Sequence, residues 1–135
     1  MQAKNFDKAK EELIKTLQHN PYHIDAHISL GILFYHTSTV EKSMDVFKDA
    51  YAVSQVHPRV NYWLGRIYYE IGKPKKALKF LKQAVRLIPD FIEGHYYLGL
   101  AYNELENYDK AIENFSKTLQ IDPLWFDSLI HLGKA

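Results

Sequence analysis

The residues of this chain that could carry out chemistry are histidines, arginines and lysines placed at helical spacing. His23 and His27 are four residues apart with Asp25 between them, a spacing that can present two imidazoles to one metal ion. No third ligand is evident, and His27 falls at a position expected to pack inside the protein. The sequence therefore predicts no metal site, and nothing in it calls for a cofactor.

Arg59 and Arg66 indicate a different chemistry, the recognition of anions. The two residues are seven positions apart, so they lie two turns along one helix face with aromatic residues between them. A guanidinium group binds a carboxylate through two parallel hydrogen bonds, and the pair could hold a carboxylate of a bound segment. The alternative is that the arginines pair with Glu70 or Glu93 of the chain itself.

A second cationic feature is a stripe of basic residues along one helix. It consists of Lys75, Lys79, Lys82 and Arg86, with Lys73 and Lys76 beside it. No acidic residue occurs from Ile71 to Pro89. The stripe faces away from the apolar positions of its helix, so we expect it to be solvated on the outer side. An acidic partner or an RNA backbone is the alternative.

Motifs of enzymatic catalysis are missing from the chain. The glycines are spread through helical segments instead of forming a phosphate-binding loop, no serine sits in a nucleophile elbow, and no paired carboxylates converge by spacing. We therefore predict that this chain is not an enzyme, with a catalytic domain elsewhere in a longer protein left open.

The composition is that of a single soluble domain. The 135 residues are 47% hydrophobic and 24% charged, and a formal net charge of +1 argues against bulk binding to nucleic acid or an anionic membrane. The absence of cysteine excludes a disulfide framework and a zinc ribbon. No uncharged apolar run approaches the ~20 residues that cross a bilayer. We expect a cytoplasmic protein, although the periplasm also fits.

An internal repeat determines the elements that position these side chains. A Leu-Gly pair recurs every 34 residues, at Leu30-Gly31, Leu64-Gly65, Leu98-Gly99 and Leu132-Gly133. Within each unit the apolar residues follow helical spacing over two segments separated by a turn, which predicts pairs of antiparallel helices. A glycine inside a helix costs about 1 kcal/mol relative to alanine. Close approach of the two helices, for example at Gly99 and Ala111, would offset that cost.

The pattern resembles that of the tetratricopeptide repeat family, which is Leu-Gly-x-x-Tyr, then Ala-x-x-x-Phe, then Pro. The best match is Leu98-Gly99-x-x-Tyr102, Ala111-x-x-x-Phe115 and Pro123. The resemblance implies an all-α fold, a right-handed superhelical solenoid of antiparallel helix pairs. The family's usual tryptophan in the first helix is replaced by His27, Asn61, His95 and Leu129.

The phase of the repeat divides the single repeat domain, 1–135, into units. Full repeats are predicted at 24–57, 58–91 and 92–125, the second helix of an incomplete repeat at 5–23, and the first helix of another at 126–135. Repeat arrays usually end in a polar-faced capping helix, and neither end supplies one. The chain is then a piece of a longer array, or the lone end helices of two copies pack together head to tail.

The family's geometry implies a concave groove lined by the first helix of each pair. Side chains that packing does not need are expected there, and the aromatic ones offer a large contact area with a polar group. The predicted peptide-binding groove consists of Ile28, Ile32, Tyr35, Arg59, Tyr62, Trp63, Arg66, Tyr69, Tyr96, Tyr97, Leu100 and Asn103. Among these, Tyr62, Trp63, Tyr96 and Tyr97 would contact the peptide, with Arg59 and Arg66 as polar anchors.

The resemblance implies a protein–protein interaction module within a larger scaffold protein, which binds a peptide or helical segment in this groove. Some family members clamp the C-terminal carboxylate of heat-shock chaperones with Lys and Asn, but Ile28, Trp63 and Tyr97 stand at such places here, so we do not expect that use. The rival prediction is a self-assembling structural element that stacks end to end. Nucleic acid binding and membrane insertion are not expected.

Overall fold

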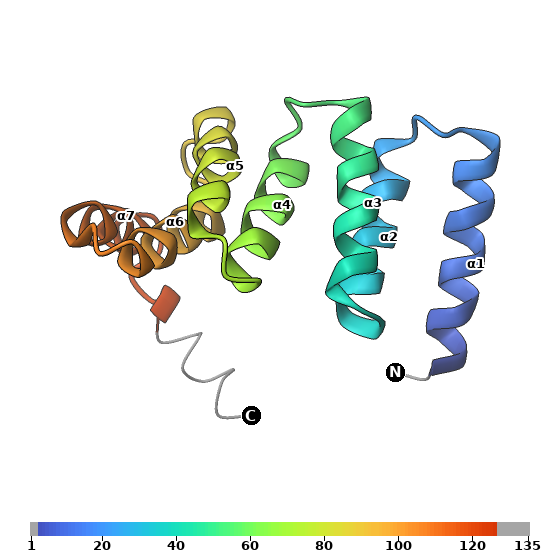
Figure 1. The fold of residues 1–135 in the computed structure, drawn as a ribbon, viewed down its shortest axis with the longest axis horizontal. Helices are drawn as coiled ribbons and strands as arrows, with labels where there is room; N and C mark the ends of the chain where they lie inside the picture. Colours follow the sequence, from blue (N-terminus) through green and yellow to red (C-terminus); the bar gives the residue numbers. More distant parts are fainter. Residues whose placement is uncertain (1–2, 127–135) are drawn as a thin grey trace.

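The computed structural model of the chain describes residues 3–126 and contains only helices and turns in that range. The helices are α1 Ala3–His19, α2 Ile24–Thr37, α3 Val40–Val53, α4 Pro58–Glu70, α5 Pro74–Leu87, α6 Ile92–Glu104 and α7 Tyr108–Ile121 (Figure 1). The predicted all-α class is thereby confirmed. The helix predicted at 126–135 lies outside the described residues except for Phe126. None of the helices within residues 3–126 is both long enough and apolar enough to span a bilayer.

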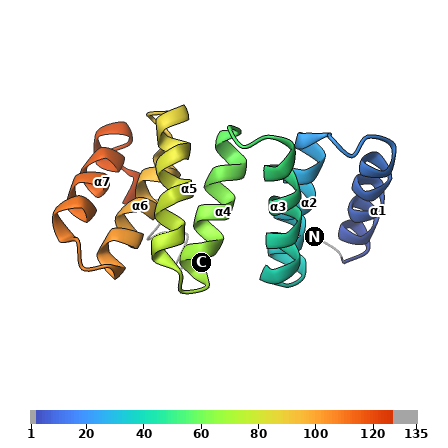
Figure 2. The same cartoon turned by 45° about the horizontal axis from the view of Figure 1, so that its top comes forward.

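The helices pair in chain order and the pairs stack into a row. α2 packs on α3, α4 on α5 and α6 on α7, while α3–α4 and α5–α6 contacts join successive pairs and α1 packs on α2 (Figures 1 and 2). α4 also contacts α6 directly. We call the side formed by α2, α4 and α6 the first-helix face, and the side formed by α3, α5 and α7 the second-helix face. Figure 2 shows α3 and α5 in front of α2 and α6.

The glycine of each Leu-Gly pair lies where the two helices of a hairpin approach most closely. A Cβ atom built on Gly31, Gly65 or Gly99 would lie 2.6, 2.5 and 2.5 Å from the nearest atom of Phe47, Leu81 and Phe115, respectively. Such distances leave no room for a methyl group. The large apolar residue of the second helix fills the space above each glycine, and at Gly99 the atoms nearest to such a Cβ belong to Phe115 and not to the predicted Ala111.

At the repeat position where the family usually has tryptophan, α2, α4 and α6 have polar residues whose side chains form a hydrogen bond. In each repeat the buried side chain donates to a backbone carbonyl six residues earlier: His27 Nε2 to Pro21 at 2.8 Å, Asn61 Nδ2 to Gln55 at 3.1 Å and His95 Nε2 to Pro89 at 2.8 Å. Buried polar groups need such partners. This hydrogen bond fixes each first helix to the loop that precedes it. One of these loops, the loop before α6, also lines the hollow described below.

The helix ends follow local rules. Pro58 and Pro74 occupy the first turns of α4 and α5, where a missing N–H costs nothing. The turn between α4 and α5 uses Gly72 with a φ of 84°, and the corresponding turn one repeat later uses Glu106 with a φ of 61°. The second and third repeats thus keep the same turn geometry even though the third lacks the glycine, whereas the equivalent Ser38 of the first repeat has a φ of −136°.

Candidate functional site

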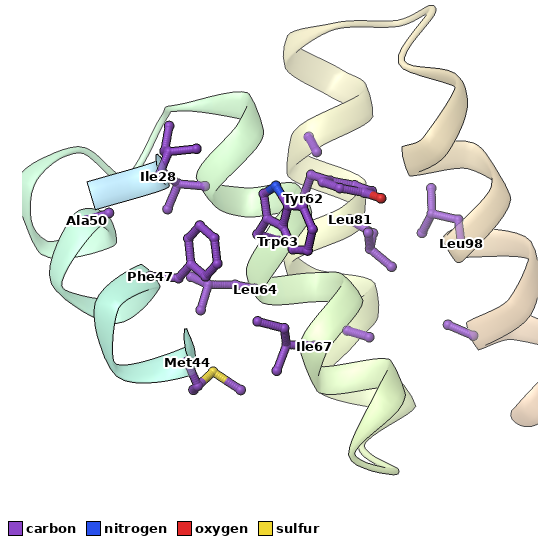
Figure 3. Close-up of a cluster of buried hydrophobic side chains, with 14 of the residues drawn as sticks. Ile28, Met44, Phe47, Ala50, Tyr62, Trp63, Leu64, Ile67, Leu81 and Leu98 are labelled. Atoms are coloured by element: carbon purple, nitrogen blue, oxygen red, sulfur yellow. The ribbon is translucent and has the colours of Figure 1, made fainter. Parts of the chain in front are cut away.

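The aromatic side chains of α4 belong to the packed core. The ring of Trp63 stacks on that of Phe47 from α3, with centroids 5.6 Å apart and planes within 4° of parallel, and it meets Tyr35 of α2 edge-on at 5.1 Å. Tyr62 lies 5.0 Å from the ring of Phe91, which precedes α6. Figure 3 shows Trp63 beside Phe47 in this cluster. Tyr97 of α6 lies 6.0 Å from Tyr62 as well, so rings from three successive repeats meet around α4.

This packing corrects part of the predicted groove. Ile28, Tyr62 and Trp63 are only 5%, 5% and 7% exposed, so the expectation that their side chains are free to bind a partner is wrong. The physical reason is the stacking of repeats, because a first helix is covered by the second helix of the preceding pair and by the start of the following pair. Tyr62 and Trp63 instead fill contacts between adjacent repeats, against Tyr97 and Phe47, respectively.

The remaining predicted groove residues retain some exposure. Arg59 and Asn103 are exposed, and the half-buried ones are Ile32, Tyr35, Arg66, Tyr69, Tyr96, Tyr97 and Leu100. Tyr97 lies 5.2 Å from Tyr96 and 6.1 Å from Tyr69 between ring centroids. The structure therefore brings α2, α4 and α6 together in a continuous aromatic layer on the first-helix face.

Arg66 is enclosed by that aromatic layer. Its Cζ atom lies 5.1 Å from the ring centroid of Tyr35, 4.8 Å from that of Trp63 and 5.0 Å from that of Tyr97. Each separation is within the range of a cation–π interaction. The rings come from α2, α4 and α6, so this one guanidinium group links three first helices. We call Arg66 and these three rings the arginine cage.

Polar contacts complete the arginine cage. Arg66 Nη1 donates to the Tyr62 hydroxyl at 3.0 Å, and Arg66 Nε lies 3.7 Å from a Glu70 carboxylate oxygen. The second distance is that of an ion pair and is too long for a hydrogen bond. The Tyr35 hydroxyl donates to the same Glu70 carboxylate at 2.6 Å. The predicted alternative, pairing of Arg66 with Glu70, is thus confirmed, and Arg66 is held inside the protein.

Tyr35, Tyr62 and Tyr97 of this layer stay neutral over a wide pH range, because their pKa values are raised. Burial raises the pKa of Tyr62 to about 12, although the nearby Arg66 acts to lower it. Burial also raises the pKa of Tyr35 and of Tyr97. Neutral phenols can both donate and accept hydrogen bonds, so Arg66 and Glu70 are the charges fixed within the layer.

A hollow of about 480 Å³ opens where α4 meets the start of α6, and we call it the α4–α6 hollow. Its lining combines cations, carboxylates and apolar groups: Arg59, Tyr62, Trp63, Arg66, Ile88, Asp90, Phe91, Ile92 and Glu93. Arg59 is exposed and forms no ion pair among the described residues, where Arg66–Glu70 is the single pair found. Tyr62 and Trp63, which also line it, are buried residues.

Sequence reasoning did not include the loop side of this hollow. Ile88, Asp90 and Phe91 lie before α6, and the prediction considered only one face of the helices. A signal existed, since Phe91 stands where the two preceding repeats have His23 and His57. Large aromatic residues at that repeat position mark the loops that pack against the tyrosine of the preceding first helix, Phe91 on Tyr62 and Trp125 on Tyr96.

The spaced histidines serve the local structure. His23 Nδ1 accepts the backbone N–H of Ala26 at 3.1 Å and so caps α2, whereas His27 points to the Pro21 carbonyl. Within residues 3–126, no three histidine or acidic side chains come together as a metal site requires.

Sequence comparison places these repeats in a family. The pattern described as "Tetratricopeptide repeat" matches residues 92–123, and the pattern "TPR repeat" matches residues 65–105. Residues 65–123 of this chain belong to the tetratricopeptide repeat family. No match was found among curated protein sequences.

Solved structures show the same architecture. A crystal structure of MamA is 26% identical with a TM-score of 0.79, covering 87% of this chain and 69% of MamA. YrrB, described as a TPR protein with an unusual peptide-binding site, is 22% identical with a TM-score of 0.78, covering 89% of this chain and 62% of YrrB. The second TPR of Spaghetti (RPAP3), bound to the HSP90 peptide SRMEEVD, is 19% identical with a TM-score of 0.71, covering 79% of this chain and 99% of that one. The tetratricopeptide chain thus spans about two thirds of the lengths of MamA and YrrB.

Proposed function

We propose that this tetratricopeptide repeat chain binds a short segment of another protein in the α4–α6 hollow. The observation that carries the proposal is the position of Arg59, an exposed guanidinium group on the wall of a hollow and free of any ion pair among the described residues. An unengaged cation beside a partly apolar hollow suits a chain segment that presents an acceptor and an apolar side chain.

The lining provides a partner for each part of a peptide. Arg59 can donate to a carboxylate or to a backbone carbonyl, and the carboxylates of Asp90 and Glu93 can accept backbone N–H groups. Phe91 and Ile92 offer apolar surface to a side chain. Because a flexible segment must be ordered when it binds, we expect a dissociation constant on the order of micromolar.

The roles of the two arginines differ in this proposal. Arg66 is already bound by Tyr62 and Glu70, so it positions the wall of the hollow, while Arg59 anchors the ligand. Support for peptide recognition comes from the neighbours, since YrrB is described with a peptide-binding site and the RPAP3 repeat domain with a bound peptide. We infer no shared ligand, because those identities are low.

The test is selection of peptides from a random displayed library on the wild-type protein, followed by titration of a selected peptide against Arg59→Ala. We expect at least about a tenfold loss of affinity, the effect of one charge-assisted hydrogen bond. The matched control is Lys48→Ala, which removes one exposed positive charge from α3 and should change nothing. Equal affinity for Arg59→Ala and wild type would contradict the proposal.

End-to-end stacking of copies is a second candidate function, favoured by the outer side of α7. Ile112 and Leu119 are 63% and 44% exposed, whereas their counterparts one repeat earlier, Leu78 and Val85, are half-buried. Light scattering over a concentration series, compared with Ile112→Lys, tests it. Wild-type assembly that Ile112→Lys abolishes supports stacking, and a monomer at every concentration contradicts it.

A further inference from the structure

A second charged feature, on the side of the molecule away from the arginine cage, is the basic surface of α5. Its six cations, Lys73, Lys75, Lys76, Lys79, Lys82 and Arg86, are all exposed. None of them takes part in an ion pair among the residues described, and the sequence around them contains no acid from Ile71 to Pro89. The chain's near-neutral total charge therefore conceals a local excess of positive charge.

A hollow of about 460 Å³ lies at this surface between α3 and α5, and we call it the α3–α5 hollow. It is lined by Tyr51, Gln55, Val56, Asn61, Lys79, Phe80, Lys82, Gln83 and Arg86. Phe80 is held in place by Tyr51, which meets it edge-on at 5.4 Å, and by Tyr68, which stacks on it at 5.5 Å. Val56 is 63% exposed beside it. The hollow thus joins a fixed aromatic wall, an exposed apolar side chain and three cations.

Two of these cations rest on aromatic rings. Lys79 Nζ lies 5.3 Å from the ring centroid of Phe80, and Lys82 Nζ lies 5.8 Å from that of Tyr102. A cation–π contact at an exposed site is weak, worth about 0.5–1 kcal/mol, and it leaves the ammonium hydrogens free to donate. The rings therefore orient the lysines without neutralising them.

The neighbouring helices limit what this basic surface can accept. On the other second helices, exposed acids alternate with exposed lysines: Asp45 and Asp49 accompany Lys48 on α3, and Asp109 and Glu113 accompany Lys110 and Lys117 on α7. The positive region is one helix wide, and at 1.5 Å per residue the stretch from 75 to 86 is about 16 Å long. A long polyanion such as RNA would meet these carboxylates. A short acidic segment laid along α5 would not.

We propose that the α3–α5 hollow, with the cations of α5, is a binding site for an acidic segment of a partner protein in which an apolar residue accompanies the carboxylates. Lys79, Lys82 and Arg86 pair with the carboxylates, and the apolar side chain packs on Val56 and Phe80. This site is formed by different residues from the α4–α6 hollow, and it stands whether or not that hollow binds a peptide.

The experiment titrates an acetylated and amidated peptide of alternating Glu and Leu into isotopically labelled protein and follows amide chemical shifts. We expect the largest changes at Tyr51–Val56 and along α5. The triple variant Lys79→Gln, Lys82→Gln, Arg86→Gln should weaken binding by at least about tenfold, and added salt should weaken the wild-type complex. Circular dichroism of the triple variant verifies that it is folded.

The matched control neutralises three exposed lysines outside the site, as Lys48→Gln, Lys110→Gln and Lys117→Gln, and it should bind as wild type does. Each of the following results overturns the proposal: equal binding by both triple variants, chemical-shift changes confined to α4 and α6, or tighter binding of oligouridylate or of phosphatidylserine vesicles than of the peptide. A peptide with Gln in place of Glu should not bind, and if it binds equally well the proposed charge recognition is wrong.

Discussion

The two faces of this solenoid use their side chains in opposite ways. On the first-helix face, Trp63 is 7% exposed and lies between rings of other helices. On the second-helix face, the cations of α5 are all exposed and unpaired within the described chain. On the first-helix face, three of the side chains expected to be free, Ile28, Tyr62 and Trp63, are buried between repeats. The second-helix face, which was expected to be only solvated, carries the charge that no ion pair among residues 3–126 neutralises.

The difference arises from what the neighbouring repeat provides. Ser29, Trp63 and Tyr97 occupy the same column of the repeat, yet they are exposed, buried and half-buried, respectively. Trp63 stacks on Phe47, whereas the residue corresponding to Phe47 one repeat later is Leu81, which has no ring to stack on. How far a side chain on the first-helix face is exposed therefore depends on which residue the second helix of the preceding repeat places against it.

The largest expected effect comes from removing the ring at the centre of the first-helix face. Trp63→Ala should lower the free energy of unfolding by about 3–5 kcal/mol, because it leaves a cavity in a packed core. Lys82→Ala on the other face should change it by no more than about 0.5 kcal/mol. Urea unfolding measures both. If both variants lower the free energy of unfolding by a similar amount, the proposed difference between the two faces is wrong.

Gly65→Ala tests how closely the two faces approach within one hairpin. A Cβ atom there would lie 2.5 Å from Leu81 Cγ and 3.1 Å from the Leu81 backbone nitrogen. Overpacking of this kind costs about 1–3 kcal/mol, so the variant should unfold at lower urea concentration despite alanine's better helix propensity. Ser29→Ala, at an exposed position inside α2, is the control and should not be destabilised. A stabilised Gly65→Ala protein would show that the hairpin is looser than described.

Arg66→Gln sharpens the comparison between arginines of the two faces. Losing the cation of the arginine cage should cost about 1–2 kcal/mol of unfolding free energy, while Arg86→Gln at the exposed site should cost almost nothing. Thermal unfolding of the two variants is the measurement. If Arg66→Gln is as stable as Arg86→Gln, Arg66 does not stabilise the stack of repeats.

The smallest expected effect is a pH dependence at the start of α4. Burial lowers the pKa of His57 below its usual value, so the unfolded chain binds a proton more readily than the folded one as the pH falls through about 6.5. Stability should therefore decrease from pH 7 to pH 5. His57→Asn keeps a capping residue without the titrating group and should reduce this decrease, whereas His36→Asn, at an exposed position, should not. An unchanged pH profile in His57→Asn would contradict the assignment.

The sequence alone was sufficient to predict the helices and their pairing, since the 34-residue phase places Gly31, Gly65 and Gly99 at equivalent contacts. The sequence also offered the pairing of Arg66 with Glu70 as one of two interpretations, because residues four apart lie side by side on a helix. The burial of Tyr62 and Trp63 could not be derived in the same way, because it depends on rings contributed by two other repeats, Phe47 of the preceding one and Tyr97 of the following one.

Emission from Trp63 alone tests the central claim most directly, namely that the aromatic layer of the first-helix face is packed core. Trp125→Phe leaves Trp63 as the only tryptophan, since the chain has two. We expect emission shifted to the blue of the unfolded protein and weak quenching by acrylamide. Emission at the unfolded wavelength, with quenching as strong as in urea, would show that Trp63 lies in solvent and would contradict the account.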